Sequence, residues 1–112
     1  MKNMKKTQPR PPAHLATATK KWFANVVEEF ELEPHHLRLL TLAAEAWDRG
    51  QQAREAIAKE GLTFTDKHGQ PRARPEVSIE RDSRIAFARL LRELALDVST
   101  PADDCRPPRI GG

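Results

Sequence analysis

Apolar residues recur at helical spacing in three stretches of the chain. In the first stretch, Trp22, Val26 and Phe30 repeat every four residues, which is the spacing of one face of an α-helix. This stripe predicts a first helix over about residues 14–32. A stripe rich in leucine predicts a last helix over about residues 76–96.

The second stretch is apolar on two faces. It begins at Pro34, which suits the first turn of a helix, and the pattern predicts a helix over about residues 34–60. A helix that is apolar on two sides is expected to pack within its own subunit on one side and against a neighbouring copy on the other. We therefore expect a homo-oligomer. For the two tryptophans core packing is the default, and a place in a subunit interface is the sharper interpretation. The residues predicted to serve assembly are Trp22, Leu40, Ala44, Trp47 and Ile57.

Between the second and third helices lies a short segment with a different pattern. Residues 62–65 alternate and favour a β-strand, and residues 70–74 can return beside them. Gly61 is suited to end the helix before this segment, Gly69 to form the turn, and Pro75 to open the next helix. A hairpin of two strands is marginal alone, so we expect it to lean on the helices or on another subunit.

Together these elements predict a mostly α protein. Its fold is a helical hairpin plus a third long helix, with a short β-hairpin between helices 2 and 3, assembled into a ring-like oligomer. The 112 residues are enough for one compact domain. The predicted organisation is a flexible basic arm (1–13), a single helical domain (14–98) and a flexible proline-rich tail (99–112).

The charge is distributed unevenly along the chain. Residues 1–21 carry six bases and no acid, whereas residues 22–60 carry eight acids and four bases. Basic arms of this kind commonly bind nucleic acid because lysine and arginine displace counterions from phosphates, although a solubilising tail would have the same composition. The residues of the arm predicted to contact DNA are Lys2, Lys5, Lys6, Arg10, Lys20 and Lys21.

A smaller group of bases lies in the predicted hairpin. The hairpin contains Lys67, Arg72 and Arg74, and its only acidic residue is Asp66. Because its net charge is positive, it could contact DNA or an acidic partner surface. The arginines of the third helix also have two interpretations. They could line a phosphate-facing stripe, or they could pair with nearby acids at helical spacing.

The sequence offers no candidate catalytic group. It contains no phosphate-binding loop with Lys-Ser/Thr and no nucleophile elbow around a serine, so an ATPase or a serine hydrolase is not expected. His35 and His36 are adjacent and point about 100° apart on a helix, so they do not converge on a metal. The single cysteine, Cys105, cannot form a disulfide within one chain. We expect no cofactor, no metal and no membrane span.

The ordered set of features resembles one family. It comprises the Pro11-Pro-Ala-His-Leu15 lead-in, Lys21-Trp22 in the first helix, Glu60-Gly61-Leu62 at the end of the second, Gly69 in the turn, Arg74-Pro75, and Leu91-Arg-Glu-Leu94. Over about residues 11–101 it is similar to the small subunit of the DNA-packaging terminase of tailed phages and prophages. Relatives often have His-Pro where this chain has Arg74-Pro75, and Gly where it has Ala95.

The resemblance implies a role without catalysis. Small terminase subunits form rings, bind viral double-stranded DNA and recruit and regulate the large subunit, which holds the ATPase and nuclease. It implies a place in the cytoplasm of the bacterial host. Many such subunits carry a separate N-terminal helix-turn-helix, and only 13 residues precede the first predicted helix here. We therefore expect the arm or the first two helices to contact DNA. Two alternatives stay open: a small helix-turn-helix transcriptional regulator, and an ATPase-regulating adaptor that does not bind DNA.

Overall fold

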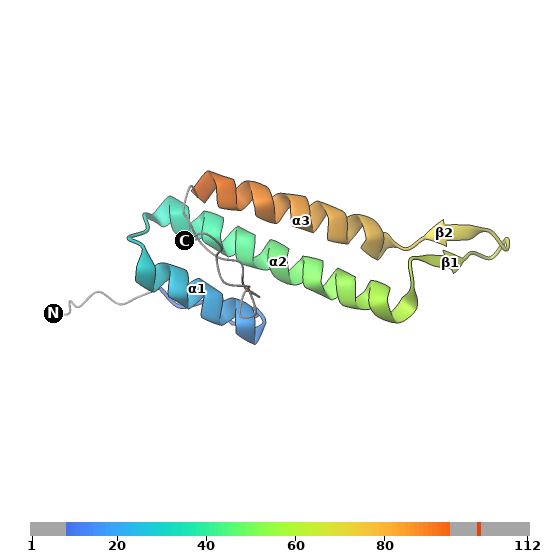
Figure 1. Cartoon of the computed structure of the whole chain (residues 1–112), viewed down its shortest axis with the longest axis horizontal. Coiled ribbons are helices and arrows are strands. Elements are labelled where there is room, and N and C mark those ends of the chain that lie inside the picture. The colour runs from blue at the N-terminus through green and yellow to red at the C-terminus, as the bar shows by residue number, and fades with distance from the viewer. Residues whose placement is uncertain (1–8, 95–100, 102–112) are drawn as a thin grey trace, which may run out of the picture.

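The structure, a computed structural model, describes residues 9–94 and residue 101. Within these residues the chain forms three helices and one hairpin (Figure 1). The elements in chain order are α1 (Thr17–Glu29), α2 (Pro34–Glu60), β1 (Thr63–Thr65), β2 (Pro71–Ala73) and α3 (Pro75–Leu94). The mostly α fold with a hairpin between the second and third helices is therefore confirmed.

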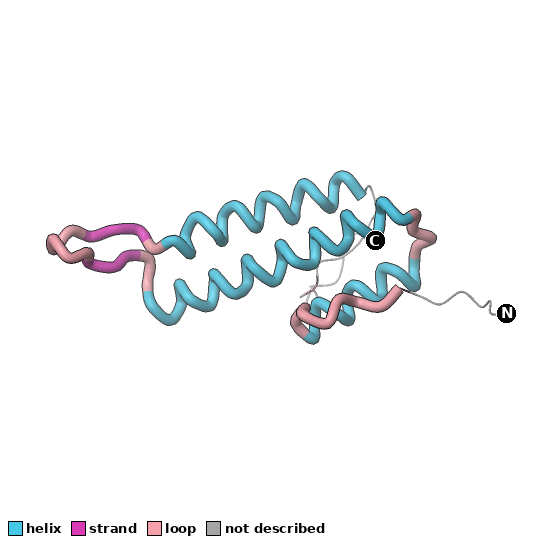
Figure 2. Tube along the Cα trace, turned by 180° about the vertical axis from the view of Figure 1, so that it is seen from behind, coloured by secondary structure: helices cyan, strands magenta, loops and turns pink. Residues whose placement is uncertain are grey.

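Helix α2 is the central element of the fold. Helix α3 returns antiparallel along most of its length, whereas α1 packs beside its N-terminal half only (Figures 1 and 2). The half of α2 nearer the hairpin therefore has only α3 beside it among the described elements. The hairpin extends beyond the ends of these two helices.

The helix boundaries differ slightly from the predicted ones. Helix α1 ends at Glu29 rather than near residue 32, because Phe30 takes an extended backbone with φ −125° and ψ 150°. Pro34 then excludes a continuous helix, since the residue before a proline avoids helical backbone. Helix α3 begins at Pro75, the residue predicted to open it and one before the predicted range of about 76–96. Its predicted end near residue 96 lies outside the described residues.

The two ends of α2 are fixed by the residues that flank it. At the start, the Glu33 side chain accepts a hydrogen bond from the backbone N–H of His36, and the Glu33 N–H donates to Nδ1 of His36 at 3.2 Å. At the other end, Gly61 has φ 93° and ψ 176°, a conformation that only glycine adopts readily. Its N–H donates to the carbonyl of Ile57 at 2.7 Å. The predicted roles of Pro34 and Gly61 are confirmed.

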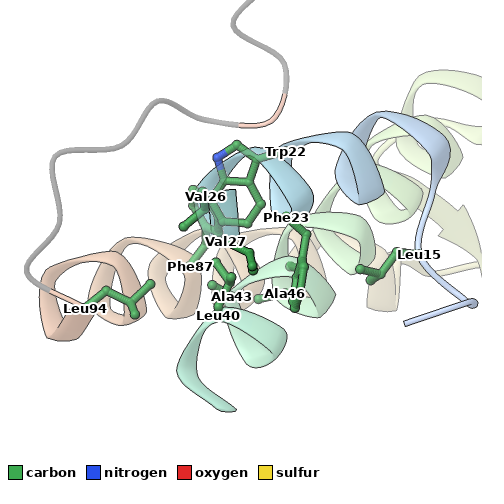
Figure 3. Packing of buried hydrophobic residues seen from close by; sticks show 11 residues of the cluster. Leu15, Trp22, Phe23, Val26, Val27, Leu40, Ala43, Ala46, Phe87 and Leu94 are labelled. Atoms are coloured by element: carbon green, nitrogen blue, oxygen red, sulfur yellow. The ribbon is translucent and has the colours of Figure 1, made fainter. Parts of the chain in front are cut away.

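The core lies where α1 and α3 meet the N-terminal half of α2 (Figure 3). Leu40, Ala43 and Ala44 of α2 expose no surface. The Phe87 ring of α3 lies 5.9 Å from that of Trp22 on α1 and 5.0 Å from that of Trp47 on α2, measured between centroids. Aromatic pairs at these separations add to the stability gained from area burial. Phe87 therefore connects all three helices.

The hairpin is regular but carries little packing. Phe64 pairs with Arg72 in its antiparallel register, and all six strand residues are exposed. Gly69 has φ 78°, which confirms its predicted place in the turn. The backbone N–H of Arg74 donates to the carbonyl of Leu62 at 2.9 Å and closes the open end. The hairpin thus keeps its shape through backbone hydrogen bonds and its turn.

The distal halves of α2 and α3 approach closely at two small residues. A Cβ atom placed on Gly50 would lie 3.4 Å from the Cβ of Ser83. That separation is an ordinary contact, so the site accepts one methyl group but little more. Larger side chains at either position would separate the two helices.

Two glycine substitutions should therefore have opposite effects on stability. Gly50→Ala should raise the free energy of unfolding by about 0.5–1 kcal/mol, because alanine is the better helix former and its methyl group fits. Gly61→Ala should lower it by about 1–3 kcal/mol, because alanine disfavours the backbone conformation at that position. Urea unfolding followed by circular dichroism measures both, and a gain from Gly61→Ala would contradict the cap geometry.

Candidate nucleic-acid interface

The predicted DNA-binding residues of the arm are only partly within the described chain. Lys2, Lys5 and Lys6 lie outside it. Arg10 and Lys21 are exposed, and Lys20 is half-buried on the first turn of α1. Lys20 and Lys21 therefore place positive charge on the first turns of α1, whereas the described residues before the helix run back beside it (Figures 1 and 2).

A buried carboxylate of α2 fixes this end of α1. Ala16, the N-cap residue of α1, has no side chain that could accept a hydrogen bond, and the first turn of a helix has unsatisfied N–H groups. Asp48 of α2 satisfies one of the N–H groups at this end, that of Ala16. Its carboxylate accepts from the N–H of Ala16 at 2.7 Å and from the Thr19 hydroxyl at 2.5 Å. Asp48 and Thr19 are both buried, so the hydrogen bond between their side chains is shielded from water, whereas the one from Ala16 is partly buried.

Further contacts secure the residues just before α1. Leu15 is 5% exposed and belongs to the core cluster. Nε2 of His14 lies 2.9 Å from Oε2 of Glu45 on α2, in a contact exposed to solvent. We call Asp48 with its partners Ala16 and Thr19 the anchor. The anchor and these two neighbours hold the root of the arm against the middle of α2.

The bases of the hairpin are largely occupied within the chain. Nε of Arg72 donates to Oδ2 of Asp66 at 2.9 Å. The guanidinium of Arg74 lies 3.8 Å from Glu60 and 5.9 Å from the centroid of the Phe64 ring. Lys67 is exposed at the turn and makes no ion pair within the described residues. The hairpin is therefore less free to bind phosphate than its sequence suggests.

Asp66 organises the hairpin turn. Its Oδ1 atom accepts hydrogen bonds from the N–H groups of His68 and Gln70, both at 2.9 Å. The Arg72 side chain, together with these backbone donors, lowers the pKa of Asp66 below its ordinary value of 3.8. The ionised carboxylate thus binds both the turn and the returning strand.

The arginines of α3 are divided between the two predicted interpretations. Arg84 lies 3.3 Å from Glu80 one turn away, and Arg81 lies 3.3 Å from Asp82. Arg89 and Arg92 are exposed and form no ion pair within the described part of the chain. Pairing therefore accounts for the first half of α3 only.

The residues predicted to serve assembly lie in different environments. Trp22, Leu40 and Ala44 are buried in the core of the single chain, which leaves little or none of their surface for a neighbour. Trp47 and Ile57 are half-buried. The large apolar side chains that are exposed in the structure were not among the residues predicted to serve assembly, because an apolar pattern alone does not distinguish exposed positions from buried ones. They are Leu42, Leu62, Phe64, Ile79 and Ile85.

The described residues form neither a metal-binding cluster nor a membrane-spanning helix. Residues 9–94 and 101 contain no group of three or more His, Cys, Asp or Glu side chains placed to hold a metal ion. None of the described helices is both long enough and apolar enough to cross a membrane.

Comparison with known proteins gives one match. The sequence model of a family described as "Phage terminase, small subunit" matches residues 18–104, which is most of the chain. The matched region contains the hairpin, α2, α3 and nearly all of α1. No curated protein and no solved structure matches the chain.

The anchor should be important for stability. In Asp48→Ala, the hydroxyl of Thr19 loses its acceptor in a buried place and the N–H of Ala16 loses its acceptor in a partly buried one, which should lower the free energy of unfolding by about 2–3 kcal/mol. Glu45→Ala, which removes only the exposed contact to His14, should cost under about 1 kcal/mol. Urea unfolding compares the two variants, and equal losses would contradict the anchor.

The hairpin turn should respond to acid. Because the pKa of Asp66 is lowered in the folded state, its stabilising effect is present above pH 3.8 and is lost as the pH falls through the lowered pKa. Arg72→Ala should move the titration midpoint of Asp66 upward, towards 3.8, whereas Arg74→Ala should leave it in place. The carboxyl carbon shift in NMR measures this midpoint, and an unchanged value in Arg72→Ala would refute the pairing.

Proposed function

Because the chain belongs to the small-subunit family of phage terminases, we propose that it is a non-catalytic DNA-packaging subunit. In this role it binds viral double-stranded DNA and recruits and regulates the large subunit that carries the ATPase and nuclease. The observation that carries the proposal is the extent of the family match, residues 18–104, which includes nearly all of the folded elements. The subunit would work in the cytoplasm of the bacterial host.

DNA contact is assigned first to the basic arm. The first 21 residues carry six bases and no acid, and of these bases Arg10 and Lys21 are exposed, with Lys20 and Lys21 in the first turns of α1. The anchor supports this assignment, because it holds the root of the arm in one place on α2. Lys67, Arg72 and Arg74 of the hairpin are secondary candidates, because both arginines already have carboxylate neighbours.

The subunit is proposed to act as a ring-like homo-oligomer. Trp47 and Ile57 keep part of their surface available for a neighbour, as do the exposed apolar side chains of α2, α3 and the hairpin. Family membership favours this role over a dimeric transcriptional regulator. An adaptor that regulates the ATPase without touching DNA differs in one measurable respect, namely that its full chain shows no salt-dependent DNA binding.

Removing the arm should weaken DNA binding in a way that depends on salt. Deleting residues 1–12 removes four bases. Each lost phosphate contact reduces the magnitude of the negative slope of log K against log salt by about 0.9, so this magnitude should fall by up to about 3.6. The double variant Lys20→Gln/Lys21→Gln should reduce the magnitude of this slope by up to about 1.8. Fluorescence anisotropy with a labelled duplex measures each slope.

Lys59→Gln is the matched control, because Lys59 lies in the last turn of α2, far from the root of the arm. It should leave the slope nearly unchanged. An unaltered affinity and slope after deletion of residues 1–12 would exclude the arm as the DNA contact. The absence of any salt-dependent binding by the full chain would favour the adaptor.

A further inference from the structure

The hairpin exposes apolar surface that the single chain does not cover. Leu62 is 61% exposed and Phe64 is 39% exposed, and residues two apart on an extended segment lie on the same face. Arg72 pairs directly with Phe64, and Arg74 lies over its ring, so this face combines two apolar side chains with two guanidinium groups. Such a small sheet is marginal in water unless it packs on something.

The hairpin is also positively charged. Residues 62–74 hold Lys67, Arg72 and Arg74 against Asp66, a net charge of +2. The side chain of Arg74 is 26% exposed and incompletely paired within the chain, since its Nη2 contact to Glu60 is long, at 3.8 Å, and its buried Nε finds no acceptor among the described residues. The exposed face is therefore suited to a partner that is both apolar and acidic.

The opposite end of α2 has these complementary properties. The turn between α1 and α2 and the residues beside it carry four exposed carboxylates, and none of them forms an ion pair within the described residues: Glu28, Glu29, Glu31 and Glu33. Over residues 28–42 the only lysine or arginine is Arg38, which leaves a net charge of −3. We call the residues from Glu28 to Glu33 the acidic turn.

An apolar hollow lies next to the acidic turn. It is lined by Leu37, Arg38, Thr41 and Leu42 in the first turns of α2, and its surface is mainly apolar. Leu42 is 52% exposed there. Carboxylates beside an apolar hollow match the guanidinium groups beside Leu62 and Phe64 on the hairpin.

These two surfaces cannot meet within one chain. They lie at opposite ends of α2, a helix of 27 residues. A helix of that length spans about 40 Å, and α3 packs along it. Any contact between hairpin and acidic turn must therefore join two copies.

We propose that the hairpin of one copy docks on the acidic turn and hollow of a second copy. Leu62 and Phe64 cover the hollow, while Arg72 and Arg74 lie beside the glutamates. The contact joins two different patches, so every copy offers one of each, and repetition generates a ring where the geometry closes. The inference rests on the self-assembly in the proposed function, and it is independent of DNA binding by the arm.

Charge reversal at each surface tests the pairing. The hairpin variant Arg72→Glu/Arg74→Glu and the turn variant Glu29→Lys/Glu31→Lys should each lose assembly, measured as mass by light scattering without DNA. The concentration at half assembly should rise at least about tenfold, which corresponds to roughly 1.4 kcal/mol. Glu33 is left intact because it caps α2.

Mixing the two variants gives the decisive result. In an equimolar mixture, the acidic hairpin of the first variant can dock on the basic turn of the second. The unchanged hairpin of the second variant can dock on the unchanged turn of the first. Because the two variants then alternate, the mixture should recover assemblies with an even number of copies equal or close to the natural number, although neither variant assembles alone. Failure to recover, or natural assembly by either variant alone, would overturn the pairing of these two surfaces.

Neutral variants keep the test decisive if a charge reversal disturbs folding. Phe64→Ala should weaken assembly, whereas Thr63→Ala, on the other face of the same strand, should not. Equal assembly by these two variants would also contradict the proposal. Arg81→Glu/Arg89→Glu on α3 makes the same change in charge and should leave the mass unaltered.

The outcomes also separate this inference from the proposed function. Natural protein that assembles and binds DNA, but is insensitive to the hairpin and turn variants, would overturn the docking alone. Natural protein with the mass of one 12.7 kDa chain would overturn both the docking and the proposed ring. DNA binding is then decided separately, by the salt slope of the arm deletion.

Discussion

The fold depends on the burial of one helix between two others. Leu40, Ala43 and Ala44 of α2 expose no surface because α1 and α3 both pack against this part of the helix. Small alanine side chains allow the neighbouring backbones to approach, and Phe87 bridges to the tryptophans of the other two helices. Neither α1 nor α3 would have an apolar partner of comparable area without α2, so the three helices are expected to fold together.

Much of this architecture follows from local sequence signals. Pro34, Gly61 and Gly69 mark the start and the end of α2 and the turn of the hairpin, because their backbone preferences act at the residue itself. The stripe of Trp22 and Val26 located α1, although the helix ends at Glu29, where one extended residue stops it. Elements set by neighbouring residues were thus predictable.

The contacts that position the candidate site were not predictable in this way. Asp48 caps a helix that begins 31 residues earlier, and no periodicity relates Asp48 to Thr17. The pairing of Arg72 with Asp66 depends on the register of the hairpin. Burial of Leu40 and Ala44 within one chain could not be distinguished from burial between copies, because both produce the same apolar stripe.

The position of the anchor sets a distance between the two basic regions. Asp48 is twelve residues before the end of α2, so the root of the arm and the start of the hairpin are separated by about 18 Å along the helix axis. Successive phosphates on one strand of a duplex are about 3.4 Å apart along its axis. Under the proposed DNA contacts, a duplex lying parallel to α2 has to extend over about five base pairs before one subunit can contact it at both places.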